Sequence, residues 1–217
     1  MIVSEPPGAP PPVFVGPSPY VIALGEVMLR FHPGEGRIRT AREGVIGAIG
    51  AGMNRSAMLA RFLRETAADV VMPAGRCTLL DQSALDGVLP TARELAKSVV
   101  AVGVFNSGLL SHDRPAEGMM YDCREAPPER VARAREIAQV CAEHGMSLPA
   151  AAMAFPGTHP SIINVTLGMR HLERVERNVQ LYHRPVPDGL WADLRARGLI
   201  RADVPARAGR GRSARCL

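Results

Sequence analysis

Short apolar runs alternate along the chain with segments whose apolar residues recur at helical spacing. Residues 45–50 are apolar or glycine throughout, and in residues 54–67 the apolar side chains fall on one helical face. The same alternation returns further along. It predicts strands at 45–50, 69–73, 98–105 and 161–167, and helices at 54–67, 90–98, 128–145, 147–155, 171–182 and 187–200.

Continuous apolar strands followed by amphipathic helices are typical of parallel βα units, whose sheet is covered on both faces. We therefore predict an α/β fold with about four such units between residues 45 and 182. In folds of this kind, ligands and reacting groups lie at the carboxyl ends of the strands.

The two ends of the chain differ from this region. Residues 1–19 hold seven of the nineteen prolines, which disfavours both sheet and core helix, so we expect an extended or disordered segment. Residues 20–44 form a divergent segment, of which 20–31 is apolar enough for a strand. We expect residues 45–200 to form the folded domain and residues 201–217 a basic, disordered tail.

Composition places the chain among soluble globular proteins. Its 217 residues suit one domain, with 47% hydrophobic and 22% charged residues. There is no run of about 20 apolar residues, and no export signal opens the chain. The cysteines form no C-x-x-C pair, which predicts a reduced, cytoplasmic protein; they are Cys77, Cys123, Cys141 and Cys216.

The formal charge of +5 does not by itself indicate nucleic-acid binding. The arginines are interleaved with acids, except in residues 206–217. That tail offers attraction to a phosphate backbone, but no aromatic residue is placed there to stack a base. The six histidines lie far apart without a His-x-x-x-His pair, so no metal site is predicted.

The glycine-rich stretch at residues 44–54 (GVIGAIGAGMN) raises the question of a phosphate-binding loop. A G-x-G-x-x-G dinucleotide fingerprint would continue from Gly50 and Gly52 to a third glycine, but position 55 is Arg. Asp69 begins its strand instead of ending it, so it does not supply the ribose-binding acid. The Rossmann interpretation therefore fails.

Four stretches, in order, instead resemble successive parts of the aldo-keto reductase family. GVIGAIGAGMN resembles the family's fifth strand, DVVMPAGRCTLLDQ its sixth, VVAVGVFNSGLLS its seventh, and residues 126–180 its closing segment. The FNSGLL and AGRCTLLDQ stretches are most similar to the D-threo-aldose (L-fucose) 1-dehydrogenase branch. The resemblance covers about residues 40–200 and implies a partial (half) TIM (β/α)8 barrel, matching the second half of the family's barrel.

The resemblance also implies NAD or NADP as cofactor, with roles for particular residues. Asn54 would hydrogen-bond the nicotinamide carboxamide, and Phe105 would stack on its ring. The pyrophosphate cradle would be the backbone of Asn106, Ser107, Gly108 and Leu109, and the adenosine-side element would hold Gly168, Arg170, Arg174 and Asn178. Because Arg170 suits either a pyrophosphate or a 2′-phosphate, NAD and NADP both stay open.

Each role has a plainer alternative. Asn54 also suits the N-cap of the helix that follows it, and Phe105 also suits the core. Arg170 and Arg174 are equally suited to be solvated helix arginines.

The family's proton-transfer residues (an aspartate, a tyrosine, a lysine and a histidine) come from strands one to four, before the matched region. Lys97 lies in the wrong unit, and none of Tyr20, Tyr121 and Tyr182 stands in a D-x-A-x-x-Y setting. We therefore predict no catalytic residue and no turnover by the chain alone. Sugar or aldehyde substrates would require a catalytic half from another chain; the alternative is a non-catalytic fragment that only binds nucleotide or self-associates.

Half a barrel leaves open strand edges and an uncovered apolar face. Three arrangements follow: residues 20–31 add a strand to one edge, two copies cover each other, or the reading frame is truncated or mis-started. The sequence favours the third, because residues 1–40 share neither rhythm nor composition with the rest.

Overall fold

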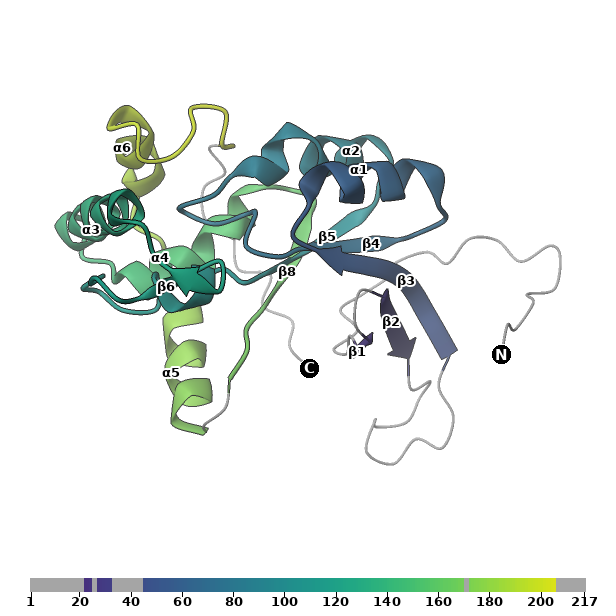
Figure 1. Ribbon diagram of the computed structural model, residues 1–217, viewed down its shortest axis with the longest axis horizontal. Coiled ribbons are helices and arrows are strands. Elements are labelled where there is room, and N and C mark those ends of the chain that lie inside the picture. Colours follow the sequence, from purple (N-terminus) through teal and green to yellow (C-terminus); the bar gives the residue numbers. More distant parts are fainter. Residues whose placement is uncertain (1–21, 25–26, 33–44, 170–171, 206–217) are drawn as a thin grey trace, which may run out of the picture.

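The computed structural model describes residues 22–24, 27–32, 45–169 and 172–205, so the expectations for the Pro-rich segment and the tail beyond residue 205 lie outside the described residues. A six-stranded sheet in the order β1-β2-β3-β4-β5-β8 organises the fold (Figure 1). Its parallel strands are β3 (Val45–Met53), β4 (Val70–Pro73), β5 (Ser98–Val102) and β8 (Ile162–Thr166).

The edge of β3 is paired with a strand of opposite direction. β1 (Ile22–Leu24) and β2 (Val27–His32) form an antiparallel pair, and β2 runs antiparallel to β3. The described residues 22–24 and 27–32 therefore add strands to one edge of the sheet, as one of the three arrangements anticipated for residues 20–31. No strand within the described ranges pairs with the far edge of β8.

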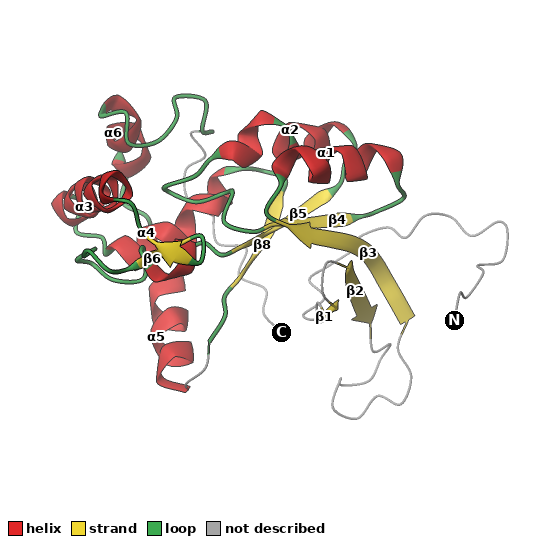
Figure 2. Cartoon of the chain, viewed as in Figure 1, coloured by secondary structure: helices red, strands yellow, loops and turns green. Residues whose placement is uncertain are grey.

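Helices connect the strands and divide into two groups. Figure 2 shows α1 and α2 over one face of the sheet, whereas α3, α4, α5 and α6 group on the side of β8. The helices are α1 (Ser56–Glu65), α2 (Val88–Glu94), α3 (Pro128–Glu143), α4 (Leu148–Ala154), α5 (Leu172–Tyr182) and α6 (Leu190–Ala196). Shorter elements are the 3-10 turns η1 (Ser83–Asp86), η2 (Asn106–Gly108) and η3 (Phe155–Thr158), and the hairpin strands β6 (Met120–Tyr121) and β7 (Arg124–Glu125).

Alternate side chains of the central strands are buried on opposite faces of the sheet. Val71 and Val99 pack into the core formed with α1 and α2, whereas Val70, Met72 and Val100 form a separate small cluster. Burial on both faces explains why β4 and β5 read as continuous apolar runs. Each fully buried Val or Leu contributes about 1.5–3 kcal/mol relative to an exposed one.

A second core lies among the helices beyond the sheet. The buried side chains of α3, α4 and α6 meet there, and the rings of Phe155 and Trp191 cross edge to face with centroids 5.7 Å apart. Helix α3 ends before Gly145, which adopts a φ of +67° that a glycine accommodates without strain.

The glycines of the opening stretch serve strand packing. A Cβ at Gly50 would stand 2.1 Å from the backbone oxygen of Val70 on β4, so only glycine allows this approach. The run is a strand that ends at Met53, three residues later than its apolar pattern predicted.

The expected architecture is confirmed: four parallel strands with their helices form part of an α/β barrel, and the cylinder is not closed. Predicted boundaries differ at the ends, because β5 stops at Val102 and α2 at Glu94. Among the helices of the described residues, none has the length and apolar character required to cross a bilayer.

Candidate functional site

The carboxyl ends of β3, β4 and β5 bring three loops together. The N–H of Ala74 donates to Met53 O (3.0 Å), and the N–H of Gly75 donates to Val102 O (2.9 Å). Because parallel strands end on the same side of a sheet, the residues that follow each strand become neighbours. This is the end at which α/β folds of this class carry their chemistry.

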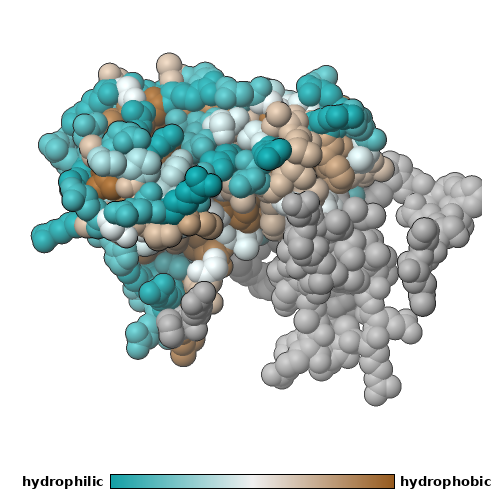
Figure 3. All heavy atoms as spheres, viewed as in Figure 1, coloured by the Kyte–Doolittle hydropathy of each residue, from teal (hydrophilic) through white to brown (hydrophobic). Residues whose placement is uncertain are grey.

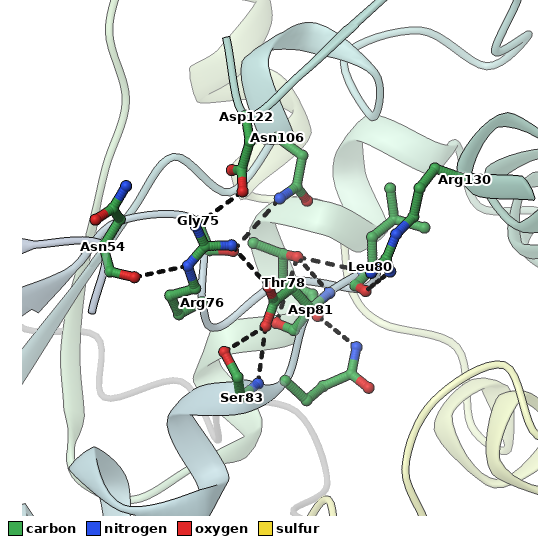
Figure 4. A network of polar contacts seen from close by, with 11 residues as sticks. Asn54, Gly75, Arg76, Thr78, Leu80, Asp81, Ser83, Asn106, Asp122 and Arg130 are labelled. Carbon is green, nitrogen blue, oxygen red and sulfur yellow. Dashed lines mark hydrogen bonds and ion pairs between the residues drawn. The ribbon is translucent and has the colours of Figure 1, made fainter. Parts of the chain in front are cut away.

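Arg76, just after β4, is the centre of a polar network (Figure 4). Its guanidinium donates to the backbone oxygen of Asn54 (2.9 Å), to Asp81 Oδ2 (2.8 Å) and to Asp122 Oδ2 (2.8 Å). The side chain is only 15% exposed, so it links three loops at a shielded position. A planar fork of five donors suits this task better than an ammonium.

Asp81 is held as a carboxylate. Burial opposes its ionisation, but the hydroxyl and N–H of Ser83 and the guanidinium of Arg76 outweigh burial, so the pKa of Asp81 lies below its usual range. The turn before it is closed by Thr78, whose hydroxyl accepts from the N–H groups of Leu80 and Asp81. The loop is therefore fixed from within.

The loop after β5 has an unusual backbone. Gly103, Asn106, Ser107 and Gly108 all adopt positive φ angles, between +45° and +110°. Asn106 is only 2% exposed; its Nδ2 reaches Gly75 O at 3.4 Å, and its Oδ1 has no hydrogen-bond partner. A buried, unpaired amide oxygen is costly unless something else pairs with it.

The N–H groups of this loop, expected to cradle a pyrophosphate, are largely engaged. Those of Asn106, Gly108 and Leu109 donate to the carbonyls of Gly103, Phe105 and Asn106. The N–H of Ser107 has no such partner within the described residues. An anion bound here would therefore meet one ready donor unless the turn opens.

The β6–β7 hairpin packs over the same place. The N–H of Cys123 donates to Ser107 Oγ (3.0 Å), and Asp122 pairs with Arg76, so the hairpin is fixed to the loops after β4 and β5. Arg130 stacks on the ring of Tyr121 at 5.1 Å and donates to Leu80 O. These contacts make the hairpin part of the site.

The nicotinamide-side candidates have different environments. Asn54 is exposed and does not cap its helix: α1 begins at Ser56, with Arg55 at the N-cap and no side-chain cap. The N-cap alternative for Asn54 is therefore wrong, because β3 continues to Met53 and the turn places its side chain outward. Phe105 is half-buried and packs against both cores, which fits the plainer core role, and Leu109 is fully buried.

The adenosine-side candidates lie apart from this network. Gly168 follows β8 in an exposed position, and Arg174 and Asn178 stand one turn apart on α5. Within the described ranges, no hydrogen bond or ion pair joins them to the loops after β3, β4 or β5. Arg170 lies outside the described residues.

The described lysine and tyrosines do not form a proton-transfer pair at the site. Lys97 lies at the amino end of β5, where its Nζ is 3.9 Å from Asp69 Oδ1. Tyr121 is near the site, but burial raises the pKa of its phenol, the reverse of what a general acid near neutral pH requires. Among the described residues no cluster of three or more His, Cys, Asp or Glu that could hold a metal ion is found.

Sequence reasoning missed the residues that organise the site, namely Arg76, Asp81 and Asp122. Arg76 had a usable signal, since it lies in the loop that follows the buried strand β4. Asp81 lies further along the same loop, beyond any such signal. Asp122 had none, because it lies 46 residues from Arg76 in a turn between two-residue strands.

The fold and the site together define a class of protein. It is an α/β half barrel whose loops gather at the carboxyl ends of its strands. The sequence model of the aldo/keto reductase family matches residues 39–197, and the chain belongs to that family.

Two relatives show how much of this chain, and how much of each relative, the sequence similarity covers. The chain is 40% identical over 158 residues to a D-threo-aldose 1-dehydrogenase of Pseudomonas sp., covering 73% of this chain and 48% of that protein. It is 36% identical over 157 residues to a pyridoxal 4-dehydrogenase of Microbacterium luteolum, covering 72% and 46%. The chain thus spans about half the length of these relatives.

A solved aldo-keto reductase from Bacillus halodurans (holo form) superposes with a TM-score of 0.51 at 21% identity, covering 72% of this chain and 51% of that chain. At this identity the likeness bears on the fold alone.

Proposed function

We propose that these residues are the cofactor-binding half of an aldo-keto reductase-type oxidoreductase that uses NAD or NADP. The substrate class is a sugar lactol or an aldehyde, in keeping with the names of the two relatives. The half carries no Asp/Tyr/Lys/His catalytic set of its own and turns over substrate only when another polypeptide supplies that set.

One observation carries the nucleotide-binding part of the proposal. Polar groups without a hydrogen-bond partner among the described residues gather at the carboxyl ends of the strands: the buried Oδ1 of Asn106, the N–H of Ser107 and the exposed side chain of Asn54. A nicotinamide carboxamide offers both a donor and acceptors, so it can pair with the amide of Asn54. The bound nucleotide supplies hydride chemistry; the residues here bind and orient it.

The second part of the proposal, inactivity of the chain alone, rests on the surroundings of its ionisable groups. Hydride transfer to a carbonyl requires a proton at the developing alkoxide, and the family uses a tyrosine acidified by a lysine for this step. Lys97 lies at the opposite end of the strands from the loops, paired with Asp69. Tyr121 lies in the hairpin that packs over the site, and burial raises the pKa of its phenol.

Titration of the purified chain with NADH and NADPH, followed by nucleotide fluorescence, tests binding. Asn54→Ala is expected to weaken binding by about 3- to 10-fold, the loss of roughly one hydrogen bond. Asn164→Ala is the matched control, because Asn164 is equally an exposed asparagine after an apolar residue, but lies on β8. Absence of saturable binding by either nucleotide, or equal effects of both variants, contradicts the proposal.

A turnover assay with L-fucose and with a simple aldehyde separates the proposal from its alternatives. We expect no rate above background from the chain alone, and a rate when a polypeptide carrying the family's first four strands is added. Steady turnover by the chain alone contradicts the proposal that the chain is inactive by itself. Nucleotide binding without activity in either mixture favours the second candidate, a non-catalytic fragment that only binds nucleotide.

A further inference from the structure

A cavity of about 560 Å³ lies where α2, the turn before β8 and the segment after α6 meet. Its volume is within the range of about 300–1,000 Å³ that pockets for small ligands occupy. Two of its lining residues, Arg93 and His159, precede β5 and β8, so the cavity lies toward the amino ends of these strands. It is therefore separate from the candidate site, which lies at the carboxyl ends.

His159 offers this cavity a hydrogen-bond donor. The residue is only 7% exposed, and its Nδ1 accepts from the N–H of Ser161 (3.2 Å). Burial, and then the charge of Arg93, lower the pKa of His159, so the ring is mostly neutral at pH 7 and carries its proton on Nε2. No side chain or carbonyl of the described residues accepts from Nε2. A donor that is shielded in this way is costly unless something pairs with it.

Arg93 brings a cation to the same cavity. Its guanidinium forms no hydrogen bond or ion pair with another described residue, and its charge acts on the ring of His159. A guanidinium presents a planar fork of donors that matches the two oxygens of a carboxylate. The cavity thus holds a cation and a neutral N–H, both without an acceptor, which indicates an anion as its ligand.

Two acidic residues of the lining decide which kind of anion fits. Glu94 pairs with Arg64 (3.7 Å), and Asp203 pairs with Arg201 (2.7 Å), so both have cations of their own. Neither needs Arg93, but both carboxylates repel additional negative charge in the cavity. A ligand with one negative charge is therefore favoured over a phosphate dianion.

The rest of the lining is apolar and consists of Leu85, Pro90 and Pro205. Figure 3 shows hydrophilic residues mixed with hydrophobic ones over α1, α2 and α6, so in this view these helices carry no broad apolar surface. The apolar wall of the cavity accordingly suits the body of a small ligand better than it suits a protein surface.

We propose that this cavity binds a small organic acid as its carboxylate. The carboxylate oxygens accept from the guanidinium of Arg93 and from Nε2 of His159, and the apolar body of the acid lies against the three apolar residues. Because the cavity is open to solvent, the complex is weak, with a dissociation constant of about 1 mM.

NMR of the full chain, titrated with sodium benzoate to about 50 mM at constant ionic strength, tests the proposal. The ring signals of His159 and the N–H signal of Ser161 report on the cavity. Arg93→Gln is expected to raise the dissociation constant by at least about tenfold, and His159→Phe by about threefold or more. Arg177→Gln is the matched control, because Arg177 is also an exposed helix arginine without an ion pair among the described residues, but lies on α5.

Saturable benzoate binding that Arg93→Gln weakens and Arg177→Gln preserves supports the proposal. Absence of a saturable shift at His159 and Ser161 overturns it, as does equal weakening by the two arginine variants. Inorganic phosphate that binds as tightly as benzoate overturns the assignment to a carboxylate, and acetate that does so overturns the role of the apolar wall. Arg93 is exposed, so its variant is expected to fold, and circular dichroism verifies this for each variant.

Discussion

In the segment that follows β4, residues 74–83, polar side chains bond one another, whereas on α5, the helix after β8, no side chain is buried. Arg76 and Asp81 are 15% exposed and joined at 2.8 Å. On α5, none of the charged side chains forms an ion pair with another described residue. Both segments follow parallel strands of one sheet, and only the second holds residues that the family resemblance assigned to the nucleotide, among them Arg174 and Asn178.

The difference teaches that a position in the barrel does not by itself make a preformed site. The segment after β4 is fixed by contacts within the chain, through Asn54, Asp81 and Asp122. No such contact through the charged side chains of α5 is found among the described residues, and the helix is held through Leu181, which packs against both cores. If this comparison holds, substitutions in the first segment affect folding, and equivalent substitutions in the second do not.

The largest expected effect is a difference in the free energy of unfolding between substitutions of two leucines. Leu109 is fully buried beside the β5 loop, so Leu109→Ala is expected to lower the free energy of unfolding by about 2–5 kcal/mol. Leu172→Ala, at a residue that is 73% exposed, should change it by less than about 0.5 kcal/mol. Urea unfolding followed by circular dichroism measures both, and equal losses contradict the comparison.

The next largest effect is the loss of unfolding free energy when either of two arginines is replaced. Arg76→Ala removes three hydrogen bonds and leaves Asp81 without its cation, so we expect a loss of about 1–3 kcal/mol at neutral pH. Arg174→Ala should stay within about 0.5 kcal/mol.

Acid unfolding extends the test of Arg76. Because the pKa of Asp81 is lowered in the fold, its contribution is present above its unfolded value and is lost as pH falls through the folded one. The difference between wild type and Arg76→Ala should therefore shrink below about pH 4. A difference that stays constant down to pH 2 speaks against this coupling.

A smaller effect concerns the hairpin. Ser107→Ala removes the acceptor of the Cys123 N–H, and we expect a loss of about 0.5–1.5 kcal/mol. Hydrogen exchange should accelerate at Cys123, while the N–H of Leu110, which donates to Phe105 O, exchanges as before. Unchanged exchange at Cys123 would show that the hairpin is held mainly by Arg76.

The smallest expected effect lies at the other end of β8. Burial, and then the charge of Arg93, lower the pKa of His159 below its usual value, and its Nδ1 accepts from the Ser161 N–H. Below about pH 6.5 the unfolded chain takes up a proton that the folded chain resists, so stability should fall as the pH decreases. His159→Gln should flatten this dependence, whereas His112→Gln, at an exposed position, should leave it intact.

Much of the fold was predictable because it depends on periodicity. The runs at 45–50, 69–73 and 161–167 contain or overlap β3, β4 and β8. Burial on both faces accounts for the continuous apolar sequence of β4, whereas most side chains of β8 are exposed. The β6–β7 hairpin was not predictable, because two-residue strands show no period. The end of β3 was misjudged because Gly52 and Met53 carry no signal that separates a strand from a turn.

The candidate site was predictable only in outline. Its location follows from strand direction, but its central residue, Arg76, acts through Asp122, which the folded chain brings across 46 positions. Nor does a sequence pattern report that the N–H groups of Gly108 and Leu109 are already engaged. Roles taken from the family resemblance remain predictions for Asn54, Ser107, Gly168, Arg174 and Asn178.

The antiparallel pairing of β2 with β3 has a kinetic consequence. Any polypeptide that completes the cylinder on that side must compete with β2 for the same backbone groups of β3, from Val45 to Ala51. Complementation would then proceed by strand exchange, and at high partner concentration its rate would level off at the rate with which β2 departs.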